Sequence, residues 1–156
     1  MTVFSQPLAI GKTNRMRLAT LNVQTLTGRL PNIIDLMSDL ELDILFLQET
    51  RVSYASRPTL VAFAKAQGFN LVTSEPSMDA NGAIIGGLAI LTRWPIQHIA
   101  TPTSISGQES VQLIKIHRPD DQPLIAVNVH FNPGNAAARG ATLNDLLQYL
   151  QMTGGD

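Results

Sequence analysis

The sequence predicts an α/β fold with a sheet and flanking helices, and three observations carry this prediction. Short apolar runs alternate with longer segments in which apolar residues recur at helical spacing. Residues 42–47 form a nearly continuous apolar run, which is typical of a strand that is buried on both faces. Residues 124–131 are dense in β-branched side chains, which strands favour.

Composition and charge describe a globular chain and exclude several classes of function. The chain has 156 residues, enough for one domain with a core, and it is 44% hydrophobic and 15% charged. Its net charge of −1 leaves no global basic field for non-specific nucleic-acid binding, so a nucleic-acid substrate needs local contacts. The sequence has no cysteine, which excludes disulfides, thiolate metal sites and cysteine nucleophiles.

The sequence predicts neither a membrane span nor a secretory signal. No apolar run reaches the length of a membrane span. Residues 1–15 place their charges after the apolar residues, whereas a signal peptide has the opposite order. We therefore expect residues 1–15 to be a flexible leader and the protein to be intracellular, in the cytoplasm or nucleus, which the lack of cysteine also fits.

Each element of the first half has its own local signal. Residues 16–22 alternate apolar and other side chains, which predicts the first strand. Pro31 suits the first turn of a helix, because the N–H that proline lacks has no partner there, and residues 32–41 follow at helical spacing. The second strand is predicted in the stretch 42–51, whose apolar part is residues 42–47. A second helix is predicted over 58–67, where a glycine follows as the C-terminal stop.

The second half consists mainly of strands and polar connections. Further strands are predicted at 69–73, 88–92, 111–116 and 124–131, with a short extended piece at 96–99. The predicted loops and turns, which are rich in Gly, Pro, Asn, Asp and Ser, are 74–83, 101–110, 119–123 and 132–135. The last helix is predicted over 136–151 and carries Leu143, Leu146, Leu147 and Leu150.

Three polar side chains stand at the carboxyl ends of predicted strands: Asn22, Glu49 and His130. Ligands of α/β sheets gather at this end of the strands, so neighbouring strands would bring the three side chains to one rim. A carboxylate at the end of a buried strand costs free energy unless it is paired or bound to a metal ion, which makes Glu49 a functional candidate. The alternatives are a solvated Glu49 that begins a loop and a His130 that is structural.

The chemistry of the three side chains is complementary. Glu49 supplies a hard oxygen ligand for Mg²⁺ or Ca²⁺. Asn22 can accept and donate hydrogen bonds at once, so it can hold a ligand or orient the glutamate. His130 can donate to a phosphate oxygen or transfer a proton.

Four segments carry a resemblance to a known family. They are L-A-T-L-N-V-Q (18–24), D-I-L-F-L-Q-E-T (43–50), G-G-L-A-I-L-T-R-W-P-I (86–96) and A-V-N-V-H-F-N-P (126–133). In this order and spacing they resemble the endonuclease/exonuclease/phosphatase superfamily, which includes deoxyribonuclease I, apurinic endonucleases, retrotransposon endonucleases and inositol-polyphosphate phosphatases. The second segment is the most specific, and the resemblance covers about residues 16–150.

The resemblance implies a fold and a chemistry. The fold is a four-layer α/β sandwich of the deoxyribonuclease I-like type, of which this chain supplies part, with one mixed sheet and flanking helices. The chemistry is phosphodiester hydrolysis that depends on Mg²⁺ or Mn²⁺. Glu49 and Asn22 would lie at the metal, and His130 takes the place of a Tyr or His that contacts the scissile phosphate. Gly86 and Gly87 match a structural glycine pair that lets two strands approach closely.

Three further residues are weaker candidates for contacts with substrate phosphates. Arg29 and Arg51 follow the two motif strands, and a solvated surface position is the alternative for both. Asn128 lies two residues before His130 on the same strand face, and its alternative is a structural amide.

The sequence departs from the family pattern near its end. Family members continue with a G-D-x-N motif, a further aspartate and a final D-H pair, and Asp156 in G-G-D is a weak match because no hydrophobic strand precedes it. We therefore expect residues 16–156 to be the N-terminal part of the domain, truncated before its C-terminal half and inactive alone. We also expect the partner sheet to be largely missing, which would leave one sheet face uncovered.

Nucleic acid is the expected substrate of the parent protein, which would be an endonuclease. A phosphomonoesterase or phospholipase that acts on a phosphorylated small molecule or lipid is an alternative in the same superfamily. A non-catalytic remnant or interaction module of the same fold is another alternative. The shared motifs do not separate these possibilities.

Overall fold

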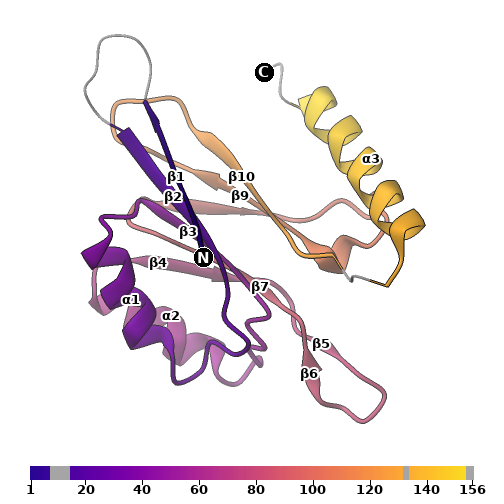
Figure 1. Ribbon diagram of the computed structural model, residues 1–156, viewed down its shortest axis with the longest axis horizontal. Coiled ribbons are helices and arrows are strands. Elements are labelled where there is room, and N and C mark those ends of the chain that lie inside the picture. The colour runs from indigo at the N-terminus through magenta and orange to yellow at the C-terminus, as the bar shows by residue number, and fades with distance from the viewer. Residues whose placement is uncertain (8–14, 132–133, 154–156) are drawn as a thin grey trace.

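The computed structural model describes residues 1–7, 15–131 and 134–153, which form ten strands and three α-helices (Figure 1). In chain order the elements are β1 (Thr2–Pro7), β2 (Arg15–Asn22), α1 (Leu30–Asp39), β3 (Ile44–Gln48), α2 (Arg57–Ala66), β4 (Asn70–Thr73), β5 (Ser77–Met78), β6 (Ile84–Ile85), β7 (Leu88–Thr92), β8 (Ile96–Ile99), the 3₁₀ turn η1 (Gln108–Ser110), β9 (Val111–Ile116), β10 (Leu124–Val129) and α3 (Ala136–Thr153). Each predicted helix and strand is present, with small shifts at the ends. Part of the predicted leader (8–14), part of the predicted turn (132–133) and Asp156 lie outside the described residues.

A mixed sheet of five strands has the order β1-β2-β3-β7-β4. β2 and β3 run parallel, whereas the other neighbouring pairs are antiparallel, so the predicted mixed sheet is confirmed. Thr2–Pro7 was expected to be a flexible leader, and this expectation is wrong for these residues because they pair with β2. The backbone hydrogen bonds to β2 define this strand, whereas its side-chain pattern gave no strand signal.

Helices α1 and α2 cover one face of the five-stranded sheet (Figure 1). The buried residues of α1 recur at helical spacing and form one stripe: Leu30, Ile33, Ile34 and Met37. This stripe packs in one apolar cluster with Leu60 of α2 and with Leu45 and Leu47 of β3. The helices therefore bury the outward face of the strand that leads to Glu49.

A second, antiparallel sheet in the order β10-β9-β8 covers the other face of the first sheet. A buried cluster joins the two sheets: Met16, Ile44 and Ile90 come from the first, and Ile114, Ile116 and Ala126 from the second. The expectation of a largely missing partner sheet and an uncovered face is therefore wrong for this face. The side-chain pattern of a strand defines its two faces but not its neighbours, so the sequence did not show where the sheet divides.

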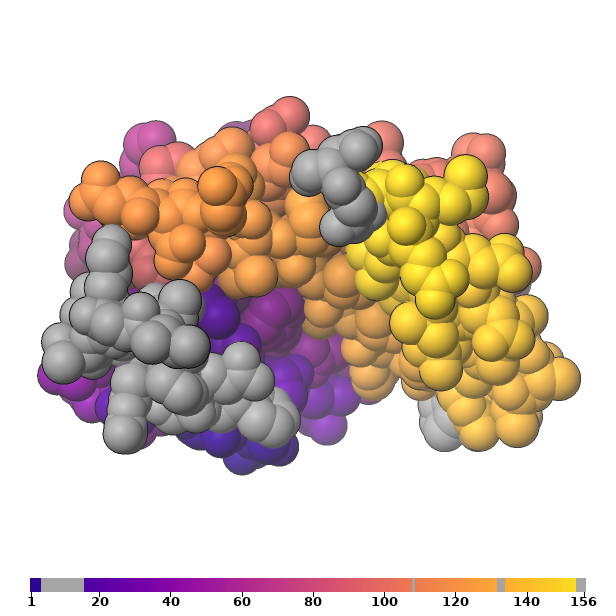
Figure 2. Space-filling view, turned by 90° about the horizontal axis from the view of Figure 1, so that it is seen from above, coloured from indigo at the N-terminus to yellow at the C-terminus, as the bar shows by residue number. Residues whose placement is uncertain are grey.

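Helix α3 packs on the outer face of the second sheet, which completes a four-layer α/β sandwich. Side chains of β9 alternate: Val111 and Leu113 pack with Leu146 of α3, whereas Ile114 faces the first sheet. Figure 2 shows the yellow helix beside the orange strand segments. The predicted four-layer class is thus confirmed, with α1 and α2, the first sheet, the second sheet and α3 as the layers.

A short hairpin of β5 and β6 begins within the segment 74–83 that was predicted as loop, and its second strand directly follows that segment. Its turn is closed by Asp79, whose Oδ1 accepts hydrogen bonds from the backbone N–H groups of Asn81 and Ala83. None of the helices in the described ranges has the length and apolar character that a membrane crossing requires.

Candidate active site

Glu49 and His130 meet at one rim of the two sheets. Glu49 directly follows β3 in the first sheet, and His130 directly follows β10 in the second. Oε1 of Glu49 lies 3.3 Å from Nε2 of His130, and the side chains are 28% and 37% exposed, respectively. The pair therefore joins the two sheets at a position that solvent and a substrate can reach.

Asn22 lies on the same rim, one strand further along the first sheet. It is the last residue of β2 and pairs with Gln48 in parallel register, so it adjoins the residue before Glu49. Its exposed side chain accepts a hydrogen bond at Oδ1 from the backbone N–H of Gln24 at 3.3 Å. A second lone pair of this oxygen is available to a ligand. The structure thus brings the three predicted residues to one rim, whereas their chemical roles stay predictions.

The backbone of Glu49 has a conformation that non-glycine residues seldom adopt. Its φ is +54°, in the left-handed region. The next two residues hold this turn in place: the N–H of Thr50 donates to the carbonyl of Gly87 at 3.2 Å, and the N–H of Arg51 donates to that of Gly86 at 2.9 Å. Strain of this kind persists only where the surroundings determine it, and here it points a carboxylate away from its strand at the rim.

Gly87 provides the space for this turn. Its φ is +94°, and a Cβ atom at this position would lie 2.7 Å from Oγ1 of Thr50 and 3.2 Å from the backbone nitrogen of Arg51. No side chain can be accommodated at such distances without a shift of the turn. The close approach that the glycine pair predicted is therefore found at Gly87.

Asn128 lies beneath the pair and is not part of the exposed rim. It is only 2% exposed. Its Nδ2 donates to the carbonyls of Leu47 at 2.9 Å and Ala89 at 3.0 Å. Its Oδ1 accepts a hydrogen bond from Nε2 of Gln48 at 2.9 Å. A buried amide whose groups are already bonded to the protein cannot contact a substrate phosphate, so that prediction is wrong and Asn128 is a structural amide.

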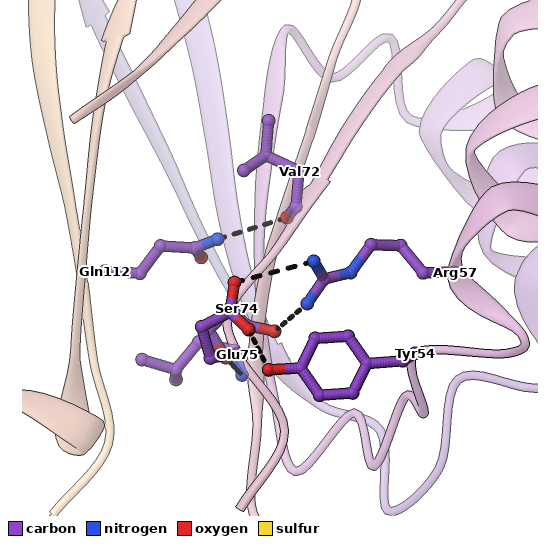
Figure 3. Close-up of polar contacts among 7 residues, drawn as sticks. Tyr54, Arg57, Val72, Ser74, Glu75 and Gln112 are labelled. Carbon is purple, nitrogen blue, oxygen red and sulfur yellow. Dashed lines mark hydrogen bonds and ion pairs between the residues drawn. The ribbon is translucent and has the colours of Figure 1, made fainter. Parts of the chain in front are cut away.

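Two glutamines that sequence reasoning missed extend this network. Nε2 of Gln48 also donates to Oγ1 of Thr20 at 2.9 Å. Oε1 of Gln112 accepts from Nδ2 of Asn128 at 3.4 Å, and its Nε2 donates to the carbonyl of Val72 at 3.1 Å (Figure 3). We call Thr20, Gln48, Gln112 and Asn128 the polar floor. The available signal was a polar residue at an inward position of an apolar strand, as at Gln48 and Gln112.

The two predicted arginines lie in the loops that leave this rim. Both are exposed. Arg29 donates from a terminal guanidinium nitrogen to the carbonyl of Val23 at 2.7 Å, which holds the loop after β2. Arg51 stands two residues beyond Glu49 and has a φ of +49°. Contact of either arginine with a phosphate stays a prediction.

The residues at the rim fit a metal ion only in part. Within the described ranges no three His, Cys, Asp or Glu residues form a group that could hold a metal ion. Of the candidate residues, Glu49 offers a carboxylate and Asn22 offers an amide oxygen. Mg²⁺ is often bound through one or two carboxylates while it keeps several waters, so this donor set fits such an ion. It does not fit zinc, which takes three or four protein ligands.

A second polar cluster, which the sequence did not predict, lies between the loops after Glu49 and after β4 (Figure 3). The hydroxyl of Tyr54 donates to Oε2 of Glu75, and a guanidinium nitrogen of Arg57 lies 3.6 Å from Oε1 of Glu75. The guanidinium also stands 5.3 Å from the centre of the Tyr54 ring. The hydrogen bond from Tyr54 is the main cause that lowers the pKa of Glu75, and it raises the pKa of Tyr54.

A protein-family model matches most of this chain. The model of the group described as the Endonuclease/Exonuclease/phosphatase family matches residues 19–154. This range contains Asn22, Glu49 and His130. Among curated proteins, none matches the chain.

Comparison with solved structures gives the same fold. An AP endonuclease from Archaeoglobus fulgidus matches with a TM-score of 0.62 and 22% identity, over 88% of this chain and 52% of that chain. A 3'-5' exonuclease from Neisseria meningitidis matches with a TM-score of 0.57 and 21% identity, over 87% and 50%. A 3' phosphatase from Neisseria bound to a product DNA hairpin matches with a TM-score of 0.58 and 21% identity, over 87% and 50%. This chain thus spans about half the length of these structures.

Proposed function

The chain belongs to the endonuclease/exonuclease/phosphatase family, and from this premise we propose that it supplies part of the active site of a divalent-metal-dependent phosphodiester hydrolase of the endonuclease type. The contact between Glu49 and His130 at 3.3 Å is the observation that carries the proposal. It places a hard oxygen ligand beside a hydrogen-bond donor, so that both can reach one phosphate group.

Each rim residue has a role in this proposal. Glu49, with the amide oxygen of Asn22, would hold Mg²⁺ or Mn²⁺. Such an ion would supply positive charge that stabilises the phosphate during hydrolysis. His130, with its proton on Nε2, donates to a non-bridging phosphate oxygen. The polar floor fixes the ends of β3 and β10, so these groups are oriented before the substrate arrives.

Nucleic acid is the proposed substrate. Two of the similar structures are described as an AP endonuclease and as a phosphatase bound to a product DNA hairpin, which supports a DNA substrate for this chain as well. Arg29 and Arg51, both exposed in loops at the rim, offer local positive charge to the backbone of such a substrate, which the net charge of −1 does not provide globally.

Residues 1–156 alone should bind the metal weakly and turn over slowly. Of the three rim residues Asn22, Glu49 and His130, only Glu49 carries a carboxylate, whereas tight sites for divalent ions combine several oxygen ligands. We therefore propose that activity of the whole protein depends on additional groups that approach the same rim.

The test of this proposal uses metal binding as well as cleavage. Mn²⁺ is titrated into ¹⁵N-labelled protein, because this paramagnetic ion broadens the NMR signals of nearby amides. In the wild type, we expect the amides near Asn22, Glu49 and His130 to broaden first, and Glu49→Gln to abolish the effect. Asp35→Asn, which changes an exposed carboxylate on α1, is the matched control. Broadening that survives Glu49→Gln would refute the proposed metal ligand.

Cleavage then separates the proposed activity from its alternatives. With protein in excess and Mn²⁺ present, a fluorescent oligonucleotide should be cut slowly, and EDTA or Glu49→Gln should stop the reaction. Hydrolysis of phosphorylated small molecules or lipids in place of the oligonucleotide would favour a phosphomonoesterase or phospholipase. Local Mn²⁺ binding without hydrolysis of any of these substrates would favour a non-catalytic module.

A further inference from the structure

A cavity of about 520 Å³ lies on the same rim as Glu49 and His130, between the two sheets. Its walls include Ser74, which follows β4, and Gln112, the second residue of β9. This volume falls within the range of small-molecule sites. Gln112 belongs to the polar floor and pairs in register with Asn128, two residues before His130. The cavity and the Glu49–His130 pair therefore share one floor.

The charge of the cavity is opposite to that of a phosphate-binding site. Its lining residues include the carboxylates of Glu75 and Glu109 and the imidazole of His98. Arg57 offsets the charge of Glu75 at 3.6 Å, whereas no ion pair offsets that of Glu109 among the described residues. Like charges brought together cost free energy, so this cavity disfavours a phosphate group. It suits the part of a ligand that is uncharged and donates hydrogen bonds.

The hydrogen-bond acceptors in the wall of the cavity differ in whether they already have partners in the protein. Glu75 is fixed by Tyr54 and Arg57 (Figure 3), so one wall is ordered without a ligand. Glu109 and His98 are exposed, and neither makes a side-chain hydrogen bond within the part of the chain that the structure describes. Their carboxylate and imidazole are therefore available to a ligand.

The cavity is close enough to the rim pair for one nucleotide to occupy both. β8 and β9 lie next to β10 in the order β10-β9-β8, and neighbouring strands are about 5 Å apart. The walls formed by β9 and the end of β8 thus lie roughly 5 to 10 Å from the strand that carries His130. A phosphate at Glu49 and His130 would place an attached base within reach of this cavity.

We propose that the cavity binds an unpaired nucleobase with an exocyclic amino group, next to a phosphate held at Glu49 and His130, with the carboxylate of Glu109 as acceptor. Carboxylates accept hydrogen bonds from amino groups such as N4 of cytosine, and unpaired bases present this edge to a protein. Adenine also carries an amino group, whereas thymine does not. This proposal rests on the proposed function, because it assigns the phosphate to the rim pair.

The experiment measures binding without hydrolysis. Fluorescently labelled, phosphorothioate-linked pentamers of oligo(dC), oligo(dA) and oligo(dT), whose linkages resist hydrolysis, are titrated with the full chain in Mn²⁺, and anisotropy gives the dissociation constants. We expect oligo(dC) and oligo(dA) to bind about fivefold more tightly than oligo(dT). Glu109→Ala should abolish this ratio, and His98→Ala should reduce it. Asp35→Ala removes an exposed carboxylate on α1, so it controls for the loss of one negative charge and should leave the ratio unchanged.

NMR spectra locate the contact independently of affinity. Adding oligo(dC) to ¹⁵N-labelled protein should shift the amide signals of Ser74, Thr101 and Glu109, which line the cavity. Equal affinity for the three pentamers, no binding of any of them, or a ratio that Glu109→Ala leaves intact would overturn the proposal. A base preference that depends on Glu109, in a protein that cleaves nothing, would refute the proposed hydrolysis and leave the nucleobase site in place.

Discussion

Oε1 of Glu49 and Nε2 of His130 lie 3.3 Å apart, although the two residues follow strands of different sheets. β3 and β10 share no backbone pairing, so this distance is set by the packing of one sheet on the other. Apolar side chains hold most of that interface, and the polar floor holds its end at the rim. The geometry of the candidate site is therefore a property of the contact between the sheets.

Replacing His130 by a residue without a hydrogen-bond donor tests whether its imidazole donates to the substrate phosphate. We expect His130→Phe to slow single-turnover oligonucleotide cleavage about 100-fold, because no group then donates to the phosphate. His130→Gln should recover part of the rate, since its amide also donates. His117→Phe is the control, because His117 is exposed and follows β9 at the far end of the second sheet. Equal rates for wild type and His130→Phe would show that His130 is structural.

Asn128 is predicted to be essential for stability. Asn128→Ala leaves the carbonyls of Leu47 and Ala89 and the amide of Gln48 without their buried partner. We expect a loss of about 2–4 kcal/mol in the free energy of unfolding, measured by urea denaturation with the fluorescence of the single tryptophan. Asn144→Ala, at an exposed position of α3, should change it by less than about 0.5 kcal/mol. Similar values for both variants would contradict the role of the polar floor.

Substitutions at Gly87 and Gly82 form a matched pair that tests the close approach of Gly87 to the turn after Glu49. Both have positive φ, +94° and +80°, but only at Gly87 would a Cβ atom meet a neighbour within 4 Å. Gly82→Ala should cost about 1 kcal/mol for its backbone alone. Gly87→Ala should cost at least about 1 kcal/mol more, because the turn that contains Thr50 must shift. Chemical denaturation measures both changes.

The same variant has a consequence for metal binding. Because Glu49 immediately precedes Thr50, Gly87→Ala should also weaken the broadening of rim amides by Mn²⁺. Gly82→Ala, in the hairpin turn between β5 and β6, should not. An unchanged Mn²⁺ response in Gly87→Ala would show that the turn does not control the position of the carboxylate.

The contact between Tyr54 and Glu75 predicts that the stability of the folded state depends on pH. The pKa of Glu75 is lowered mainly by the hydrogen bond from Tyr54, so its ionised form is favoured in the folded state. The resulting stabilisation is fully present above the unfolded-state pKa and is lost as pH falls through the folded-state pKa. Tyr54→Phe should raise the pKa of Glu75, which an NMR titration of its side-chain carboxyl carbon measures. Tyr149→Phe, which alters the other tyrosine, should leave that titration unchanged.

The placement of the three candidate residues at one rim could be predicted because strand ends are visible in the sequence. Asn22, Glu49 and His130 each follow an apolar or β-branched run, and the position of a polar residue after such a run does not depend on which strands are neighbours. The polar floor could not be predicted, because Gln48 and Asn128 meet only through the packing of two sheets. The cluster of Tyr54 and Glu75 likewise depends on two loops that are distant in sequence.

The fold was predicted to a similar extent. Elements with a local pattern were found, whereas β1 is defined by its partner and the division into two sheets by packing. For the last helix, α3, the sequence likewise predicted the element but not its contacts. Leu146 is 4% exposed, but Leu143 and Leu147 are 46% and 48% exposed, because only one side of α3 contacts the sheet. An apolar spacing predicts a helix, but not how much of its surface is covered.

The long separation in sequence between the two halves of the rim also determines when the site forms. Glu49 leaves the ribosome well before His130, and contacts between residues far apart in a chain form slowly because a large loop must close. The pair of Glu49 and His130 requires both sheets in contact, so its appearance can serve as a marker that the two sheets have docked.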